Sequence, residues 1–204
     1  MLAELSFLGR LGILLLFCVV ASLFDLKKAP RQRHRWREYL LLWMGLAAGA
    51  AAGMLFDAVT SSLSPEYFEH GKQIARDGAF FKNVLRLGAE AGAGAGVVVG
   101  AVLLLANRSP GESLRLCRYF WIPFVAAATL GCALGTLQWL WPIASMENLV
   151  YLVGSDGERR FLTVWMTHFG IYGGAVFGLI VAAVRLRRSQ QQENARDRAA
   201  ATGV

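Results

Sequence analysis

The sequence predicts an all-α fold, a polytopic membrane helix bundle of about five transmembrane helices. Hydrophobic residues make up 55% of the 204-residue chain, and they gather in five apolar stretches. About 20 apolar residues cross a hydrocarbon core of roughly 30 Å, so each stretch is long enough to span a membrane. Four of the stretches also carry a small residue at every fourth position. Such rows let helix backbones approach closely in lipid, which is typical of tightly packed bundles.

One transmembrane domain is expected over residues 1–188. Its predicted spans lie near residues 5–24, 38–57, 87–106, 119–141 and 162–184. The first span has no glycine row and is expected at the periphery. Lys27 and Lys28 follow it in place of a signal-peptidase site, so it is interpreted as a retained anchor. The rows of the other four spans are Gly45/Gly49/Gly53, Gly88/Gly92/Gly96/Gly100, Ala127/Gly131/Gly135 and Gly170/Gly174/Gly178.

The connection between the second and third spans begins with a helix-start signal, Ser64-Pro65-Glu66. Serine is a favoured N-cap, proline is favoured at the first helical position, and an acid is favoured in the first turn. A short amphipathic helix is therefore expected here, with Tyr67 and Phe68 on its apolar face. It would lie on the outer membrane surface or cap the bundle.

Two further segments lie outside the spans. Residues 142–161 contain Gly154-Ser-Asp-Gly157 and are expected to form a turn or a small hairpin. Residues 189–204 are expected to form a polar cytoplasmic tail, disordered or a frayed helix, because they have little apolar surface to bury.

The net charge of +7 is distributed as in a membrane protein rather than a nucleic-acid-binding protein. Most of the 21 basic residues lie near residues 26–38, near 107–118 and after residue 184, which fall on one side of a five-span chain. By the positive-inside rule this side is cytoplasmic and the N-terminus lies outside. We therefore expect a bacterial inner (plasma) membrane protein with the bilayer as its partner. The small-residue rows would also suit a homo-oligomer or a membrane-protein partner.

Seven polar side chains are candidates for a ligand, ion or proton site on the outer side. Ionisable groups within a membrane are costly and therefore candidates for function. Asp57 continues a glycine row one turn beyond Gly53, so it should face a packed neighbour. The candidates are Asp57 and Glu90 in the second and third spans, His168 and Tyr172 in the fifth, and Glu66, Tyr67 and His70 on the loop helix.

Three interpretations of these residues remain open. Imidazole and carboxylate groups would suit a divalent cation, or a proton relay tuned by burial. No segment supplies two ligands at metal-motif spacing, so neither a metal nor a cofactor is predicted. Glu90 and His168 also lie nearly opposite the glycine rows of their own helices, which complicates convergence. In the structural alternative, Asp57 caps the next loop, Glu90 pairs with Arg86, and His168 bonds a backbone carbonyl.

A short segment of the chain resembles a family of uncharacterised bacterial multi-pass membrane proteins. The resemblance rests on Asp57-Ala-Val-Thr60 followed by Ser64-Pro-Glu-Tyr-Phe68, and it covers residues 45–100. Glu69 stands where that family's pattern has threonine. The family has no assigned activity, so the resemblance implies membrane residence and little more. It marks Asp57, Glu66, Tyr67 and Phe68 as positions to test first.

The sequence favours a non-enzymatic membrane protein that assembles with itself or with partners, or that binds a small ligand at its outer face. The alternative is a small secondary transporter or ion- or proton-conducting protein that uses Asp57, Glu90 and His168. An envelope or lipid-modifying enzyme comes third. The chain carries no nucleophile elbow or zinc-protease motif, and its glycine-rich Gly92–Gly96 segment lies in an apolar span rather than after a strand, unlike a phosphate loop.

Overall fold

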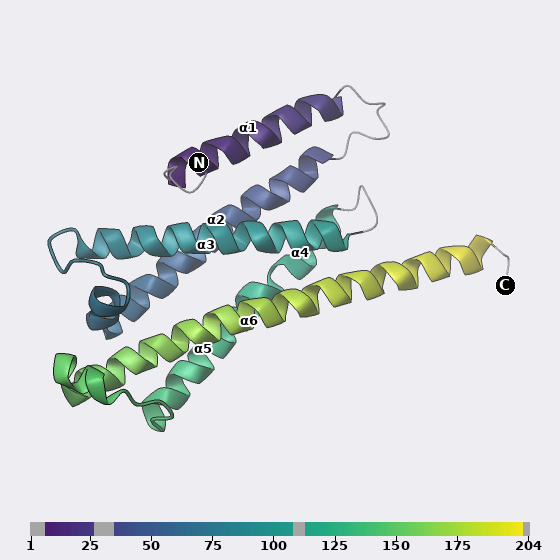
Figure 1. Ribbon diagram of the computed structural model, residues 1–204. Helices are drawn as coiled ribbons and strands as arrows, with labels where there is room; N and C mark the ends of the chain where they lie inside the picture. The colour runs from purple at the N-terminus through teal and green to yellow at the C-terminus, as the bar shows by residue number, and fades with distance from the viewer. Residues whose placement is uncertain (1–6, 27–34, 108–112, 202–204) are drawn as a thin grey trace.

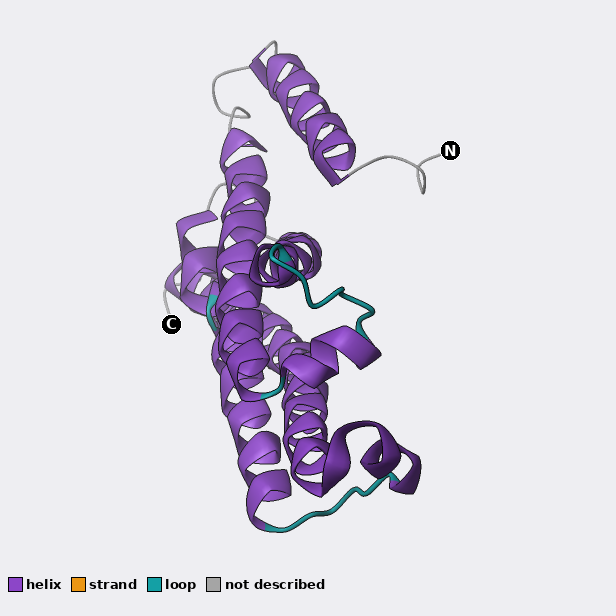
Figure 2. Ribbon diagram, turned by 90° about the vertical axis from the view of Figure 1, so that its left-hand side faces the viewer, coloured by secondary structure: helices purple, strands orange, loops and turns teal. Residues whose placement is uncertain are grey.

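The computed structural model describes residues 7–26, 35–107 and 113–201, and within these ranges every regular element is helical (Figures 1 and 2). This confirms the all-α prediction. The elements are α1 (Phe7–Leu26), α2 (Arg35–Leu63), the short π-helix η3 (Tyr67–Gly71), α3 (Phe80–Ala106), α4 (Ser113–Phe120), α5 (Ile122–Leu140) and α6 (Glu147–Ala201).

Four helical segments in the described part of the chain are long and apolar enough to cross a membrane, where the sequence predicted five. They are Tyr39–Leu63, Phe80–Ala106, Leu116–Leu140 and Val150–Ala200. The predicted first span, 5–24, is helical as part of α1. It is not one of the four membrane-length segments found among the described residues. The α1 helix lies at the edge of the bundle (Figure 1).

The bundle consists of two tightly packed helix pairs, α2 with α3 and α5 with α6. In the first pair the two predicted glycine rows face each other. A Cβ atom added to Gly49 would overlap the carbonyl oxygen of Gly92, and one added to Gly53 would overlap that of Gly88. The main chains are therefore in direct contact, as the four-residue spacing predicted.

The second pair is built in the same way. A Cβ atom added to Gly174 would overlap the Ala126 carbonyl oxygen and lie 2.8 Å from the Cα of Ala127. On the opposite helix, a Cβ atom at Gly131 would lie 2.6 Å from Cγ1 of Ile171. Each glycine row thus packs against the partner helix of its own pair. The other faces of the helices are left for contact between the two pairs.

Large apolar side chains also cover the outside of the bundle. Leu105 is 81% exposed, and Leu55, Val125 and Phe177 are each more than 60% exposed. Exposed apolar surface on this scale marks an interaction surface. Together with the four long apolar helices, it is the surface expected of a multi-pass membrane protein.

The connection between α2 and α3 begins as predicted but is less helical than expected. Ser64 is fully buried, and its Oγ accepts a hydrogen bond from the Tyr67 backbone N–H at 3.4 Å. The helical turns end at Gly71. Gln73 has a φ of 57°, a left-handed conformation that stops a helix.

The α6 helix differs from the prediction at both ends. A turn exists at Gly154, with φ of 73° and ψ of 170°, but helix lies on both sides of it, so the hairpin prediction was wrong. At the other end, the helix continues to Ala201 where a disordered tail or frayed helix was expected. The beginning of that tail is fixed because the Gln190 side chain is buried and donates a hydrogen bond to Asn107 Oδ1.

Candidate functional site

Asp57 of α2 and His168 of α6 meet between the two helix pairs. The Nε2 atom of His168 lies 3.0 Å from Oδ1 of Asp57, and the two side chains are only 7% and 11% exposed. Asp57 fits here because Gly88 of α3 has no side chain. A Cβ atom at that position would lie 2.9 Å from Asp57 Oδ2.

His168 reaches Asp57 because it lies opposite the glycine row of its own helix. The row packs against α5, so the opposite face of α6 points toward α2. The second ring nitrogen, Nδ1, lies 2.9 Å from the carbonyl oxygen of Val164 in the preceding turn. Both nitrogens of the imidazole are therefore engaged, one within α6 and one across the bundle.

Aromatic rings enclose the Asp57–His168 pair from the η3 side. The Tyr67 ring stacks on the imidazole at 4.9 Å between centroids with an interplanar angle of 24°. Phe68 approaches the same ring edge-on at 6.0 Å. Both aromatic side chains are buried and belong to an apolar cluster with Val84 of α3 and Phe161 of α6. The short η3 helix thus covers the pair.

Burial raises the pKa of the Tyr67 phenol above its ordinary value, and the nearby Tyr172 and Asp57 add to the shift. Each of these causes disfavours a second negative charge next to Asp57. Tyr67 therefore stays neutral at physiological pH and acts as an aromatic cover with a hydroxyl group.

Three of the candidate residues do not join the pair. Glu90 forms an ion pair of 2.7 Å with Arg86 on the surface of α3, as the structural alternative predicted. Glu66 accepts a hydrogen bond from Ser64 Oγ at 3.1 Å and faces Arg76 at 4.0 Å. His70 is exposed. Convergence is thus limited to Asp57, Tyr67, His168 and, at 6.4 Å between ring centroids, Tyr172.

Of the two remaining predictions of the structural alternative, the structure bears out the one for His168 but not the one for Asp57. His168 does bond a backbone carbonyl, but Asp57 binds His168 rather than only capping the next loop. Within the described ranges, no group of three His, Cys, Asp or Glu side chains is arranged to hold a metal ion. The arrangement is a two-residue polar contact with an aromatic cover.

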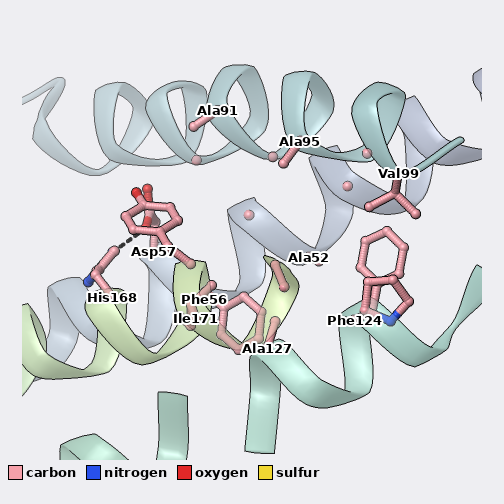
Figure 3. Close-up of a pocket in the computed structure, with 18 of the residues that line it drawn as sticks. Ala52, Phe56, Asp57, Ala91, Ala95, Val99, Phe124, Ala127, His168 and Ile171 are labelled. Carbon is pink, nitrogen blue, oxygen red and sulfur yellow. Dashed lines mark hydrogen bonds and ion pairs between the residues drawn. The ribbon is translucent and has the colours of Figure 1, made fainter. Parts of the chain in front are cut away.

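A cavity of about 150 Å³ begins at this pair and extends between the helix pairs (Figure 3). Its wall is mostly apolar, and small residues from α2, α3 and α5 leave the space open. Asp57, His168 and Tyr172 lie at its polar end together with Lys72. The labelled wall residues are Ala52, Phe56, Ala91, Ala95, Val99, Phe124, Ala127 and Ile171.

Phe56, Phe124 and Lys72 were not among the site residues predicted from sequence. The only sequence signal for the cavity is the second small-residue face of α3, where Ala91 and Ala95 alternate with the glycine row. Lys72 lies in a loop whose path depends on the packing of η3, so no local pattern predicts its position.

The fold and the site together define a class: a helical protein with four membrane-length apolar segments, a buried Asp–His contact and an apolar cavity beside it. No family model, curated protein or solved structure matches the chain. The resemblance of residues 45–100 to a bacterial membrane protein family therefore stays a prediction.

Proposed function

We propose that this chain is a non-enzymatic multi-pass membrane protein that binds a slender, largely apolar ligand between its two helix pairs. The observation that supports this most directly is the cavity beside the Asp57–His168 pair. Its glycine, alanine and phenylalanine wall suits a hydrocarbon chain, and its polar end suits a single hydrogen-bonding group. Lys72 adds a positive charge at that end and favours an acidic group such as a carboxylate.

An enzymatic role is less well supported, although two ionisable side chains lie within hydrogen-bond distance beside a cavity. A general base needs one ring nitrogen available to the substrate while the other is held in place. In His168 both nitrogens are occupied, by Asp57 and by the Val164 carbonyl. The residues that line the cavity include no Ser, Thr or Cys, so its hydroxyl group is the phenol of Tyr172 rather than a serine-type or cysteine-type nucleophile.

A proton-coupled carrier is the second candidate, and one observation favours it. The Asp57–His168 contact joins α2 of one pair to α6 of the other, so a change in its protonation would act on the interface between the pairs. Glu90 has no part in this version because it pairs with Arg86 on the surface. Against a carrier of polar solutes, the cavity wall is apolar, and the break at Gly154 lies near one end of α6 rather than beside the cavity.

We propose a bacterial inner-membrane location with the C-terminus in the cytoplasm. The start of α2, the end of α3 and the end of α6 lie at one end of the bundle (Figure 1), and the sequence places its basic residues there. This arrangement suits the positive-inside rule. The Asp57–His168 pair then lies toward the outer face. Assembly with a second copy or another membrane protein remains part of the proposal.

The test is photolabelling of the full-length protein in lipid vesicles with a long-chain fatty acid that carries a diazirine in its chain. Labelled peptides should map to the cavity wall, at Ala91, Ala95 and Phe124, and unlabelled fatty acid should compete. Ala95→Trp fills the cavity and should reduce this labelling at least tenfold. Val98→Trp is the matched control, because Val98 lies on α3, is 55% exposed and is not part of the wall.

Two outcomes would contradict the proposal. One is labelling confined to outward-facing residues such as Val98 and Leu105. The other is equal labelling of Ala95→Trp and Val98→Trp. Proton-driven uptake of a solute into vesicles that contain the purified protein, abolished by Asp57→Asn, would instead favour the carrier.

A further inference from the structure

The hydrogen-bond geometry of His168 determines where its protons can be. A carbonyl oxygen only accepts hydrogen bonds, so Nδ1, at 2.9 Å from the Val164 oxygen, must carry a hydrogen. A neutral imidazole carries one N–H, which leaves Nε2 as an acceptor. An ionised carboxylate also only accepts, yet Nε2 lies 3.0 Å from Asp57 Oδ1. Two acceptors at that distance repel each other.

The other neutral tautomer does not remove the problem. If Nε2 carries the hydrogen, it can donate to the Asp57 carboxylate, but Nδ1 then presents a lone pair to the Val164 carbonyl oxygen. This tautomer keeps the hydrogen bond from His168 to Asp57 but loses the one from His168 to the Val164 carbonyl. Both observed contacts form together only when the pair holds one additional proton.

We infer that Asp57 and His168 form a binding site for a single proton shared by the pair. The proton resides on Nε2, giving an imidazolium–carboxylate pair, or on the Asp57 carboxyl, giving two neutral groups. Either state has no net charge. Loss of the proton leaves a net negative charge on the pair, buried beside an apolar wall, which is unfavourable.

The groups that face the pair from each neighbouring element are consistent with this site. From η3, the electron-rich face of Tyr67 lies over the imidazole and stabilises a cation there. From α3, Gly88 contributes no side chain. From α6, Tyr172 contributes a phenol. Lys72, which lines the same cavity and lies 5.6 Å above the Tyr67 ring, opposes a positive charge on His168.

No second carboxylate competes for this proton among the described residues around the pair. Glu66 is engaged by Ser64 and faces Arg76, and Glu90 is engaged by Arg86. The proton is thus bound by a contact that joins Asp57 of α2 to His168 of α6. If the proposed ligand occupies the adjacent cavity, proton binding and closure of that cavity around the ligand are linked. Only this last step rests on the proposed function.

The test is the pH dependence of unfolding of the full-length protein in detergent, compared between wild type and Asp57→Asn. In the unfolded chain near neutral pH, aspartate is ionised and histidine is mostly neutral, so the folded state binds one more proton. Stability must then fall as pH rises. A fully linked proton changes the unfolding equilibrium constant up to tenfold for each pH unit.

Asp57→Asn should flatten this dependence, because an asparagine amide donates to neutral His168 without the extra proton. Glu90→Gln makes the same chemical change at the Arg86 pair and should leave the wild-type slope unchanged. Equal slopes in wild type and Asp57→Asn overturn the inference.

Nitrogen NMR of the wild-type protein gives a second test that does not depend on the stability of Asp57→Asn. The chain contains three histidines, and His168→Gln assigns the signal. We expect Nδ1 protonated, together with either a protonated Nε2 or a protonated Asp57 carboxyl in the infrared spectrum. A neutral His168 observed beside an ionised Asp57 near neutral pH overturns the inference, whatever the outcome of the ligand photolabelling.

Discussion

Gly92 and Gly94 of α3 offer a direct test of the main-chain contact between α2 and α3. They lie two residues apart on one helix and face different surroundings. A Cβ atom added to Gly92 would overlap the Gly49 carbonyl oxygen and lie 3.1 Å from the Cα of Gly53. A Cβ atom added to Gly94 would meet no other atom within 4 Å.

The two alanine variants isolate the steric cost of that contact. Replacing glycine by alanine inside a helix gains about 1 kcal/mol in intrinsic propensity, and this gain is the same at both positions. Overpacking a close-packed site costs about 1–3 kcal/mol. At Gly92 the overlap is with backbone, which cannot rotate away, so the upper value applies. We expect Gly94→Ala to be up to about 1 kcal/mol more stable than wild type, and Gly92→Ala to be about 3 kcal/mol less stable than Gly94→Ala.

The measurement is the free energy of unfolding by SDS titration in mixed micelles, followed by circular dichroism. Gly49→Ala should reproduce the loss from the opposite side of the contact. Values for Gly92→Ala and Gly94→Ala within about 0.5 kcal/mol of each other, the usual range for surface changes, would refute the close approach of α2 and α3.

Three other perturbations have defined outcomes. Gln138→Ala removes three hydrogen bonds to the loop after α5 from a side chain that is 1% exposed. It should cost about 2–3 kcal/mol in the same titration, while the exposed Gln191→Ala should cost little. Gly154→Ala should lower the free energy of unfolding by about 1–3 kcal/mol, because φ at this position is 73°. The space around Gly154 is open, so this cost comes from backbone strain and not from a steric clash. Tyr67 should ionise after the other tyrosines in an alkaline absorbance titration. Since its folded-state pKa is raised, stability should fall as pH rises above about 10, and Tyr67→Phe should weaken that fall.

The glycine rows were readable from sequence because their spacing is a local property of one helix. A residue at every fourth position returns to nearly the same face, so Gly49 and Gly53 had to share a contact surface. Which rows would meet was not readable. The pairing of α2 with α3 depends on the connection through η3, and that connection is less helical than its Ser64-Pro65-Glu66 start indicates.

The first span was predicted from its length and apolar content alone, and it is not among the four membrane-length segments of the described residues. Arg10 lies inside the predicted span, and α1 lies at the edge of the bundle (Figure 1). Residues 189–204 were expected to be disordered or a frayed helix, and α6 continues through them to Ala201. Their polar composition gave no sign that Gln190 would have a buried partner, Asn107, on a segment distant in the sequence.

The position of Asp57 was predictable from the helix period, which sets the face on which each residue lies. The same period explains why the position of His168 was not predicted. Asp57 extends the row of Gly53, so its direction toward α3 followed from the helix period. His168 and Glu90 both lie opposite their own rows, and the sequence treated this as evidence against convergence. In the folded bundle the face opposite a row is the face available to the second helix pair. The second pair covers that face at His168 but leaves Glu90 at the surface.

Most residues of the site therefore come from one short segment of the sequence, although the site lies between two helix pairs. Asp57, Tyr67 and Phe68 are supplied by one segment, in which α2 ends and η3 turns back over the end of the helix. Ser64 makes this return possible by capping the turn that carries Tyr67. His168 and Tyr172 come from α6 of the second helix pair. The segment thus forms the acidic and aromatic half of the site, and α6 supplies the base on which the shared proton depends.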